Sequence, residues 1–389
     1  MRVTHVITRL ILGGAQENTV ATVLGLHNKP PFQVSLLSGP TQGREGTLEH
    51  YFHDNPQLLQ VVPNLVREIN PWKDFWAYRD LLLRFRKDAP NIVHTHSGKA
   101  GILGRLAAAK AAVPLIIHTI HGPSFGPFQG AIPNAIYRQA EVTAAKKTTH
   151  FISVAQAMTD QYLAAGIGTS RQYSLIYSGF PLGPYLQTTN DPGLRKQLGL
   201  EPEDFVIGKV ARLFELKGHD DLLHAAQEIV QKFPRARFLF VGDGPWRNRF
   251  ERMVREQGLT GKVIFTGLVP PEQIPSLLGV MDMLVHLSRR EGLPRALSQA
   301  LAAGKPVLAY DCDGAREVCL DNITGVLLKP GDVSGVAAGI LKIARNPALA
   351  NQFGTAGRNL VREKFSVEGM VQSIGDLYLR LAREQNLLP

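Results

Sequence analysis

Short apolar runs rich in β-branched residues alternate with longer runs of helical character along almost the whole chain. Residues 115–120 and 325–328 are examples of the short runs, and residues 100–112 of the long ones. This alternation is typical of α/β folds, in which each helix returns the chain so that the next strand pairs in parallel. At 389 residues the chain is too long for one ordinary core, so two doubly wound domains are expected.

A loosely patterned segment with four prolines, residues 180–202, separates two groups of predicted strands. The first group comprises residues 3–12, 32–37, 92–93, 115–120, 151–154 and 173–177; the second begins at Phe205 and continues at 237–241, 263–265, 283–287, 306–310 and 325–328. We therefore predict an N-terminal Rossmann-like domain at residues 1–190 and a C-terminal one at residues 191–365. Ser366 is the expected cap of a last helix that runs to about Glu384.

The dipeptide Asn70-Pro71 predicts the start of a further helix. Its apolar face is expected to hold Phe75, Tyr78, Leu82 and Phe85, and its other face is basic, with Lys73, Arg79, Arg86 and Lys87. A helix that covers a sheet is favoured, and a helix that lies on a membrane surface is the alternative. Residues 122–133 are rich in proline and glycine and predict an irregular loop.

Composition places the protein among globular chains of the reducing cytosol. The hydrophobic fraction is 44% and the charged fraction 20%, and no apolar run has the length of a membrane span. Arg9 interrupts the first apolar segment, which argues against a signal peptide. Cys312 and Cys319 fit neither a disulfide framework nor a zinc pattern. We therefore expect a cytoplasmic protein.

The net charge of +10 is concentrated in the first half of the chain. Residues 1–190 hold 17 Lys/Arg against 10 Asp/Glu. This excess favours an anionic surface or substrate, such as phospholipid headgroups or a phosphorylated lipid carrier, although it also fits bulk solubility. Contact with the inner face of the cytoplasmic membrane is therefore kept open. No basic tail or aromatic-rich basic stripe indicates nucleic acid.

The stretch at residues 286–309 combines a strand end, a loop and a helix start. Pro294 suits the first helical turn, because the amide that it lacks would be unpaired there. Glu291 and nearby backbone amides are thus expected at the carboxyl end of a parallel strand, where α/β proteins hold ligands. A carboxylate there can accept hydroxyl groups while amides bind phosphate. The alternative is a helix start that a carboxylate merely stabilises.

Three more loops follow predicted strands. Gly13-Gly14 lets the backbone approach a phosphate, although a tight turn without a ligand fits as well. Arg212 and Lys217 flank one turn and suit a diphosphate, the alternative being solvated surface bases. His121 can hydrogen-bond a hydroxyl or move a proton, but lone histidines are more often structural. His94, His96 and His118 nearby lack a convincing metal-ligand spacing with carboxylates.

Two other motifs carry little weight. Asp311-Cys312-Asp313 mimics the D-x-D of metal-dependent sugar transferases, but two tandem domains are the wrong setting for it. Gly242-Asp243-Gly244 follows a strand like a dinucleotide turn, but Arg247 occupies the third glycine position. No G-x-S-x-G motif of a catalytic serine occurs.

A set of motifs in a fixed order resembles glycosyltransferase family 4, whose members are retaining, nucleotide-sugar-dependent enzymes of the GT-B fold. The motifs are GGAQEN at 13–18, HG at 121–122, ARLFELKG at 211–218, VGDGP at 241–245, FTGL at 265–268, SRREGLPRALSQALAAGKPV at 288–307 and DGAREV at 313–318. The resemblance implies two Rossmann-like domains facing a central cleft. It also implies that the C-terminal helix, residues 366–389, packs back on the first domain.

The resemblance also assigns roles to individual residues. Arg212 and Lys217 would hold the donor diphosphate, which the amides of Gly13 and Gly14 also approach. Glu291 would bind the hydroxyls of the transferred sugar. Further residues would surround the donor or acceptor: Gly292 and Leu293 near the sugar, Gly267 and Leu268 at the nucleobase, and His121 on the acceptor side near the anomeric carbon. No metal or cofactor is implied, because Arg and Lys neutralise the leaving diphosphate.

One position departs from the family motif. The second glutamate of the motif, which grips ribose hydroxyls, is replaced here by Gln299. A neutral acceptor changes such a contact by about 1–2 kcal/mol, which affects nucleotide affinity or identity more than the chemistry.

The predicted function is transfer of a sugar from a UDP- or GDP-linked donor to a glycan or lipid-linked acceptor in cell-surface polysaccharide or glycolipid synthesis. The alternatives are a non-catalytic nucleotide-sugar-binding protein of the same fold, and a sugar-nucleotide epimerase or a phosphorylase.

Overall fold

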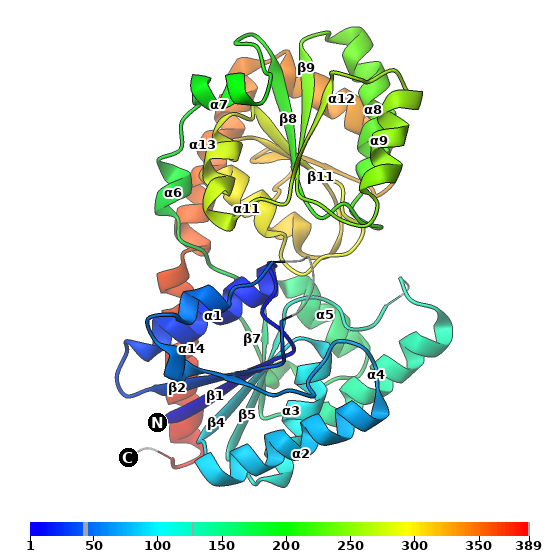
Figure 1. Ribbon diagram of the computed structural model, residues 1–389. Coiled ribbons are helices and arrows are strands. Elements are labelled where there is room, and N and C mark those ends of the chain that lie inside the picture. Colours follow the sequence, from blue (N-terminus) through cyan, green and yellow to red (C-terminus); the bar gives the residue numbers. More distant parts are fainter. Residues whose placement is uncertain (42–45, 127, 388–389) are drawn as a thin grey trace. The chain divides into compact units, whose positions relative to one another are not determined.

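The computed structural model describes residues 1–41, 46–126 and 128–387. Their packing divides the chain into two units (Figure 1). Unit 1 comprises Met1–Phe180 and Val367–Pro389, and unit 2 comprises Pro181–Ser366. The packing boundary therefore falls between Phe180 and Pro181, at the start of the proline-containing segment. Each unit is built on one parallel sheet with helices on both faces, so the chain has the expected α/β class.

The sheet of unit 1 has seven strands in the order β3-β2-β1-β4-β5-β6-β7. Its strands are β1 (Arg2–Ile7), β2 (Gln33–Ser38), β3 (Leu59–Val61), β4 (Ile92–His96), β5 (Leu115–Ile120), β6 (His150–Ser153) and β7 (Tyr173–Leu175). Its α-helices are α1 (Gly14–His27), α2 (Pro71–Asp88), α3 (Gly98–Lys110), α4 (Ala131–Ala145), α5 (Gln156–Ala164) and α14 (Val367–Glu384). All neighbouring strands pair in parallel.

The two faces of this sheet pack against different helices. Along β5, Leu115 and Ile117 belong to a core shared with α1 and α14, whereas Ile116 belongs to a core shared with α2 and α3. The alternation follows from the period of two along a strand. Both faces are covered, so β1, β4 and β5 are buried at nearly every position, although histidines and threonines interrupt their apolar residues. The apolar residues made these strands visible in the sequence.

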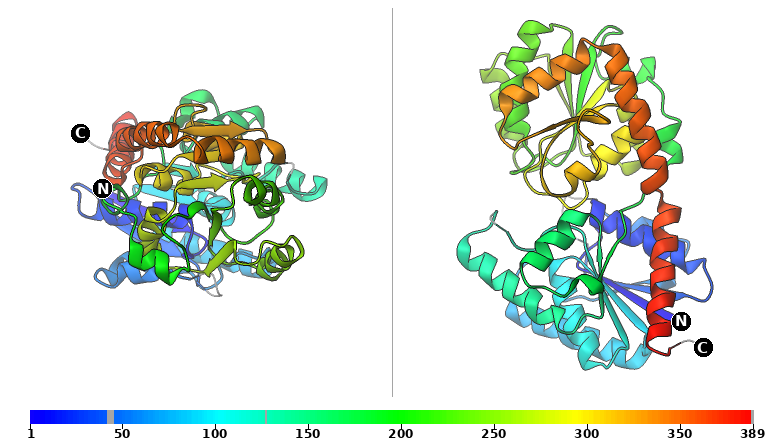
Figure 2. Two further views of the ribbon diagram at one scale, coloured as in Figure 1. Left: turned by 90° about the horizontal axis from the view of Figure 1, so that it is seen from above. Right: turned by 180° about the vertical axis from the view of Figure 1, so that it is seen from behind.

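The last helix, α14, belongs to unit 1 although it lies at the end of the chain. It runs along α1 (Figure 2), where the Cβ of any residue at Gly25 would lie 2.6 Å from Val371 Cγ2. Tyr378 of α14 is fully buried and its hydroxyl lies 2.5 Å from His94 Nδ1. The helix begins at Val367, directly after Ser366. It therefore completes the core of unit 1.

Unit 2 repeats the plan with six parallel strands in the order β10-β9-β8-β11-β12-β13. They are β8 (Phe205–Val210), β9 (Ala236–Val241), β10 (Val263–Gly267), β11 (Met283–His286), β12 (Val307–Tyr310) and β13 (Gly325–Leu328). The α-helices are α6 (Gly183–Leu186), α7 (Pro192–Gln197), α8 (His219–Lys232), α9 (Arg247–Glu256), α10 (Ile274–Gly279), α11 (Arg295–Ala302), α12 (Val333–Ala344) and α13 (Pro347–Lys364).

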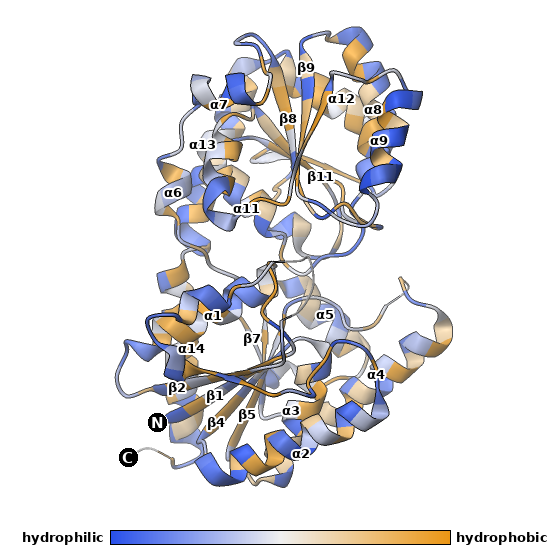
Figure 3. Ribbon diagram, viewed as in Figure 1, coloured by the Kyte–Doolittle hydropathy of each residue, from blue (hydrophilic) through white to orange (hydrophobic). Residues whose placement is uncertain are grey.

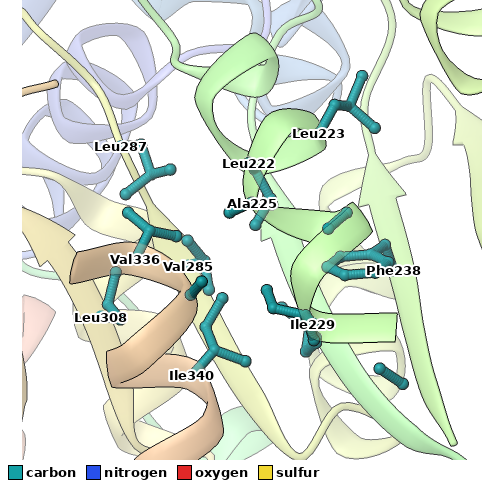
Figure 4. Packing of buried hydrophobic residues seen from close by; sticks show 14 of the residues in the cluster. Leu222, Leu223, Ala225, Ile229, Phe238, Val285, Leu287, Leu308, Val336 and Ile340 are labelled. Atoms are coloured by element: carbon teal, nitrogen blue, oxygen red, sulfur yellow. The ribbon is translucent and has the colours of Figure 1, made fainter. Parts of the chain in front are cut away.

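One core of unit 2 lies between its sheet and the helices α8 and α12 (Figure 4). Leu222 and Ile229 of α8 and Ile340 of α12 meet Val285 of β11 and Phe238 of β9 in it, and all five side chains are fully buried. Strands β8 and β9 are mostly apolar, while the outer faces of α8 and α9 are polar (Figure 3). This distribution fixes which face of each helix meets the sheet.

Several expectations about local structure were wrong. The first strand ends at Ile7 rather than at residue 12, and the loop predicted at 122–133 gives way to α4 from Ala131 onward. In α2 the buried residues are Ala77, Leu81 and Phe85, whereas Phe75 is half exposed. The short, partly exposed strand β3 was missed. Asn70 does cap α2, since its Oδ1 accepts the amide of Lys73 at 3.0 Å.

The strand predicted at residues 92–93 extends through His96, because its histidines are buried and bonded to polar groups on other elements. Among the histidines packed in or beside this sheet, five lie near its centre: His5, His94, His96, His118 and His121. Burial lowers the pKa of His5 and of His121 to about 3, and it lowers the pKa of the other three well below the usual value. All five are therefore neutral near pH 7.

Among the described residues, no helix is both long and apolar enough to cross a membrane.

The buried histidines predict that mild acid unfolds unit 1. Their pKa values are lower in the folded state than in the unfolded state, so the unfolded chain binds more protons below about pH 6.5. The stabilisation is complete above that pH and is lost as the pH falls through it, by about 1 kcal/mol per histidine for each pH unit. Urea unfolding at pH 7.5, 6.5 and 5.5 measures this slope, and a free energy of unfolding that stays constant to pH 5.5 contradicts the prediction.

Candidate functional site

Two loops of unit 2 meet where the order of its strands changes direction. From β8 the chain continues through β9 to β10 on one side, and β11 pairs with β8 on the other. In open parallel sheets the carboxyl ends of the strands on either side of such a switch point are the usual ligand site. The loop after β8 carries Arg212 and Lys217, and the loop after β11 carries Glu291.

An ion pair joins these loops. Lys217 Nζ lies 2.6 Å from Glu291 Oε1, and the two side chains are 27% and 15% exposed. His286, the last residue of β11, places its Nε2 3.0 Å from the same oxygen. No described residue hydrogen-bonds the second oxygen, Oε2. This oxygen is available to accept a hydrogen bond from a hydroxyl group of a ligand.

Electrostatics keep Glu291 ionised. Burial alone would raise the pKa of Glu291, but Lys217 and His286 together hold it well below its usual value. Burial lowers the pKa of His286, and the hydrogen bond to Glu291 opposes that shift in part. A carboxylate in this state accepts hydrogen bonds and is a poor general acid near neutral pH. In this state Glu291 can accept hydrogen bonds from hydroxyl groups more readily than it can donate a proton.

The backbone holds the two loops together. The amide of Arg289 donates to the carbonyl of Leu216 at 2.8 Å, and the amide of Glu291 donates to Asp313 Oδ2 at 2.7 Å. Leu216 and Gly218 both adopt φ of +66°, and a Cβ at Gly218 would lie 2.1 Å from the carbonyl oxygen of Leu287. Only glycine fits where the loops are this close.

The remaining candidate residues of unit 2 lie near this edge of the sheet or behind it. Arg212 is exposed, with its guanidinium 5.4 Å from the centre of the Phe214 ring. Gly267 ends β10 with φ of +75°, and Leu268 beside it is 48% exposed. Gly292 and Leu293 are buried in the loop before α11. These placements agree with the strand-end positions expected from the sequence.

Gln299 lies deeper than a ligand-binding residue usually does. It is 8% exposed on α11, and its Nε2 donates to the hydroxyl of Tyr185 on α6 at 2.8 Å. The contact ties α11 to the short helix that opens unit 2. The amide thus has a structural partner in addition to the nucleotide role that the motif implies.

Unit 1 also places its candidates at the carboxyl edge of its sheet. Gly13 precedes α1 and Gly14 is its first residue; no side chain caps this helix, so its first amides face outward from the loop after β1. His121 directly follows β5 and is half-buried, with its Nε2 3.0 Å from His96 Nδ1. An uncapped helix start and an imidazole can both hydrogen-bond an anionic ligand.

Sequence reasoning missed the residues that support Glu291. His286 binds its carboxylate, and Asp313 binds its amide even though Asp313 belongs to the discounted D-x-D motif. Asp311 of that motif pairs with Arg316 at 2.7 Å. Lys209 on β8 is fully buried without a hydrogen-bond partner among the described residues, and burial, with Lys217 nearby, lowers its pKa to about 7. A polar residue inside an otherwise apolar strand was the available signal for His286 and Lys209.

Comparisons with known proteins match both units. The model described as Glycosyltransferase Family 4 matches residues 12–182, and the model described as Glycosyl transferases group 1 matches residues 190–360. The chain therefore belongs to glycosyltransferase family 4 and is a glycosyltransferase.

Two relatives and two solved structures resemble the chain over most of its length. UDP-Gal:alpha-D-GlcNAc-diphosphoundecaprenol alpha-1,3-galactosyltransferase of Escherichia coli is 28% identical over 97% of both chains. The capsular polysaccharide biosynthesis glycosyltransferase CapM of Staphylococcus aureus is 24% identical over 85% of this chain and 87% of its own. Anabaena HepE in complex with UDP-glucose has a TM-score of 0.83 at 21% identity, covering 98% of this chain and 100% of HepE. Sucrose-phosphate synthase of Thermosynechococcus elongatus has a TM-score of 0.81 at 21% identity, covering 99% and 100%. The fold is GT-B.

The glycine at the meeting point of the two loops gives a stability prediction. Gly218→Ala places a Cβ against the carbonyl of Leu287, so we expect it to cost about 3 kcal/mol or more of unfolding free energy. Gly258→Ala is the matched control: Gly258 has φ of +68° with open space around it, and we expect a cost of about 1 kcal/mol. Urea unfolding of both variants measures the difference, and equal costs would show that the loops do not constrain residue 218.

Proposed function

We propose that the protein transfers a hexose from a UDP-sugar, with retention of the anomeric configuration, to a glycan or lipid-linked acceptor in cell-surface polysaccharide or glycolipid synthesis. The observation that carries the proposal is the Lys217–Glu291 pair at the switch point of unit 2, with Glu291 Oε2 open to a ligand. The named substrates of the Escherichia coli relative, UDP-Gal and a GlcNAc-diphosphoundecaprenol, support this substrate class, as does the UDP-glucose complex of HepE. GDP-linked donors remain the alternative.

The proposed roles follow from charge and position. Lys217 and Arg212 bind the diphosphate and stabilise the charge that develops on it as the sugar leaves, so the mechanism requires no metal ion or further cofactor. The amides of Gly13 and Gly14 bind anionic oxygens. Glu291 orients the sugar through its hydroxyls, a contact that gains strength only in the correct geometry. The departing diphosphate then assists attack by the acceptor hydroxyl on the same face of the sugar.

The other donor residues are proposed to contact the substrate mainly through their backbones. Gly292 and Leu293 lie next to Glu291 in the sugar-binding loop, and Gly267 and Leu268 receive the nucleobase. Gln299 accepts from ribose hydroxyls through its carbonyl oxygen while its amide stays bonded to Tyr185.

A surface of unit 1 supports contact with an anionic membrane, where lipid-linked acceptors reside. Trp72, Phe75 and Trp76 on α2 are 70%, 50% and 38% exposed, and the guanidinium of Arg79 lies 5.3 Å from the Trp76 ring. Helix α3 packs between α2 and α4, and α4 exposes Ile132 and Ile136. Aromatic side chains beside basic ones are typical of surfaces that insert shallowly into lipid headgroups.

Replacement of Glu291 tests the donor site. We expect Glu291→Ala to lower kcat for UDP-sugar-dependent transfer by tenfold or more, because the lost contact is worth a few kcal/mol in the transition state. Glu228→Ala is the control, since it removes an exposed carboxylate paired with Lys232 at 2.7 Å on the same unit. A loss below tenfold in Glu291→Ala rules out the assigned role. Binding of nucleotide sugars by the wild type without any turnover would favour the non-catalytic alternative.

Vesicle binding tests the membrane proposal. We expect the wild type to cosediment with vesicles that contain anionic phospholipid and not with vesicles of phosphatidylcholine alone, with weaker binding at high salt. The double variant Trp72→Ala/Trp76→Ala should lose most of this binding. Ile323→Ala, which removes an apolar side chain 55% exposed on unit 2, should retain it. Equal binding to both kinds of vesicle, or an unchanged double variant, would refute the proposal.

A further inference from the structure

Three histidines of unit 1 meet end to end. His121 Nε2 lies 3.0 Å from His96 Nδ1, and His96 Nε2 lies 2.9 Å from His5 Nδ1. Each pair of ring centres is 5.3 Å apart, with interplanar angles of 30° and 14°. The nitrogen–nitrogen distance and the two ring radii add up to about the distance between the ring centres. The rings therefore meet edge to edge, and each hydrogen bond lies close to the planes of both rings. The rings form a continuous chain from β1 through β4 to the residue after β5.

Such a chain has only two arrangements of its protons. Burial makes all three imidazoles neutral near pH 7, because it lowers each pKa well below the usual value. A neutral imidazole has one N–H and one lone pair. His96 therefore donates to one neighbour and accepts from the other, and the N–H groups of the chain all point toward His121 or all point toward His5.

The inner end of the chain decides between these arrangements. His5 Nε2 is buried and has no hydrogen-bond partner among the described residues. If the N–H groups pointed toward His5, an N–H would be orphaned there; if they point toward His121, only a lone pair is left unpaired. Orphaned buried N–H groups are rarer in folded proteins than under-satisfied acceptors. The chain therefore runs from His5 as donor, through His96, to His121 Nε2 as acceptor.

A metal site is the rival explanation for these residues, because ring nitrogens of His5, His94 and His96 lie within 4.8 Å of one another. His94, however, has both nitrogens bonded to hydroxyls, Nδ1 to Tyr378 and Nε2 to Thr119 at 2.6 Å. Its ring also lies across that of His96, with centres 4.2 Å apart. A shared metal ion would require at least two of these hydrogen bonds to break, one of His94 and one of His96, so the hydrogen-bonded chain is the better account.

We propose that His96, which accepts a hydrogen bond from His5, is a positioning residue that holds His121 in the tautomer with its proton on Nδ1. His121 then offers a hydrogen-bond donor to a substrate oxygen, such as a sugar hydroxyl or a phosphate oxygen, and does not act as a base. The contact with a substrate rests on the proposed function, whereas the tautomer does not. This assignment sharpens the sequence-based expectation that His121 either binds a hydroxyl or moves a proton.

Nuclear magnetic resonance of the protein labelled with ¹⁵N-histidine tests the tautomer directly. Two-bond couplings between ring nitrogens and carbon-bound protons identify which nitrogen carries the proton, and His121→Asn assigns the signal. We expect Nδ1–H for His121 in the ligand-free wild type. A proton on Nε2 overturns the proposal, and this measurement does not depend on any variant that replaces a residue of the inner chain.

Variants of the inner residues then test the cause. In His96→Leu the donor to His121 Nε2 is lost, so the signal of His121 should shift toward the Nε2–H form. His94→Leu is the matched control, since it removes an equally buried imidazole and two hydrogen bonds but none of the hydrogen bonds of the chain, and it should leave the tautomer of His121 unchanged. An unchanged tautomer in His96→Leu contradicts the proposal.

Kinetics separate this proposal from the proposed function. If His121 donates to the substrate, His96→Leu should lower kcat about tenfold, with a smaller effect of His94→Leu at a similar loss of thermal stability. A wild-type protein with the Nδ1–H tautomer and no transferase activity would overturn the proposed function and leave the histidine chain standing. Full kcat in His96→Leu would overturn the positioning role.

Discussion

The ion pair between Lys217 and Glu291 is the contact on which the candidate donor site depends. It links residues 74 positions apart, on loops that follow the neighbouring strands β8 and β11. Those strands flank the point where the strand order reverses, which is the usual ligand site of an open parallel sheet. If either residue were replaced by an apolar one, the charge of the other would be left partly buried without a partner, at an energetic cost. The ion pair therefore holds both side chains charged and in position before any ligand binds.

The same architectural rule operates in unit 1 with different chemistry. Its strand order reverses between β1 and β4, and the histidine chain crosses from His5 on β1 to His96 on β4 before it reaches His121 after β5. The uncapped start of α1 follows β1 at the same edge. One unit thus carries fixed charges and the other carries neutral hydrogen-bonding groups.

Sequence reasoning found most of the strands because both faces of a parallel sheet are buried, so short runs of β-branched and other apolar residues mark its strands. It predicted β5 and β13 with their observed bounds. It stopped β4 too early because His94 and His96 look like loop residues, and the partners that satisfy them, such as Tyr378, lie far away in the chain. In α2, Ala77 is buried and Phe75 is not. Hydrophobicity alone would predict burial of Phe75 before burial of Ala77.

The sequence indicated which loops carry the candidate site, but it did not indicate which side chains contact one another there. Strand-end loops and the family resemblance pointed to Arg212, Lys217 and Glu291. The contact of Glu291 with His286, the support from Asp313 and the contact of Gln299 with Tyr185 depend on side-chain positions. A linear pattern contains no such information.

Binding of UDP and of uridine to the wild type and to Lys217→Met tests the central claim most directly. Uridine lacks the diphosphate, so the difference between the two affinities isolates the contribution of the phosphate-binding groups. Calorimetry should show that UDP binds the wild type at least about tenfold more tightly than uridine, a difference of 1.4 kcal/mol or more. In Lys217→Met this difference should shrink while the uridine affinity stays the same. An unchanged UDP affinity in Lys217→Met, or equal affinities of the wild type for both ligands, would contradict a diphosphate site at this ion pair.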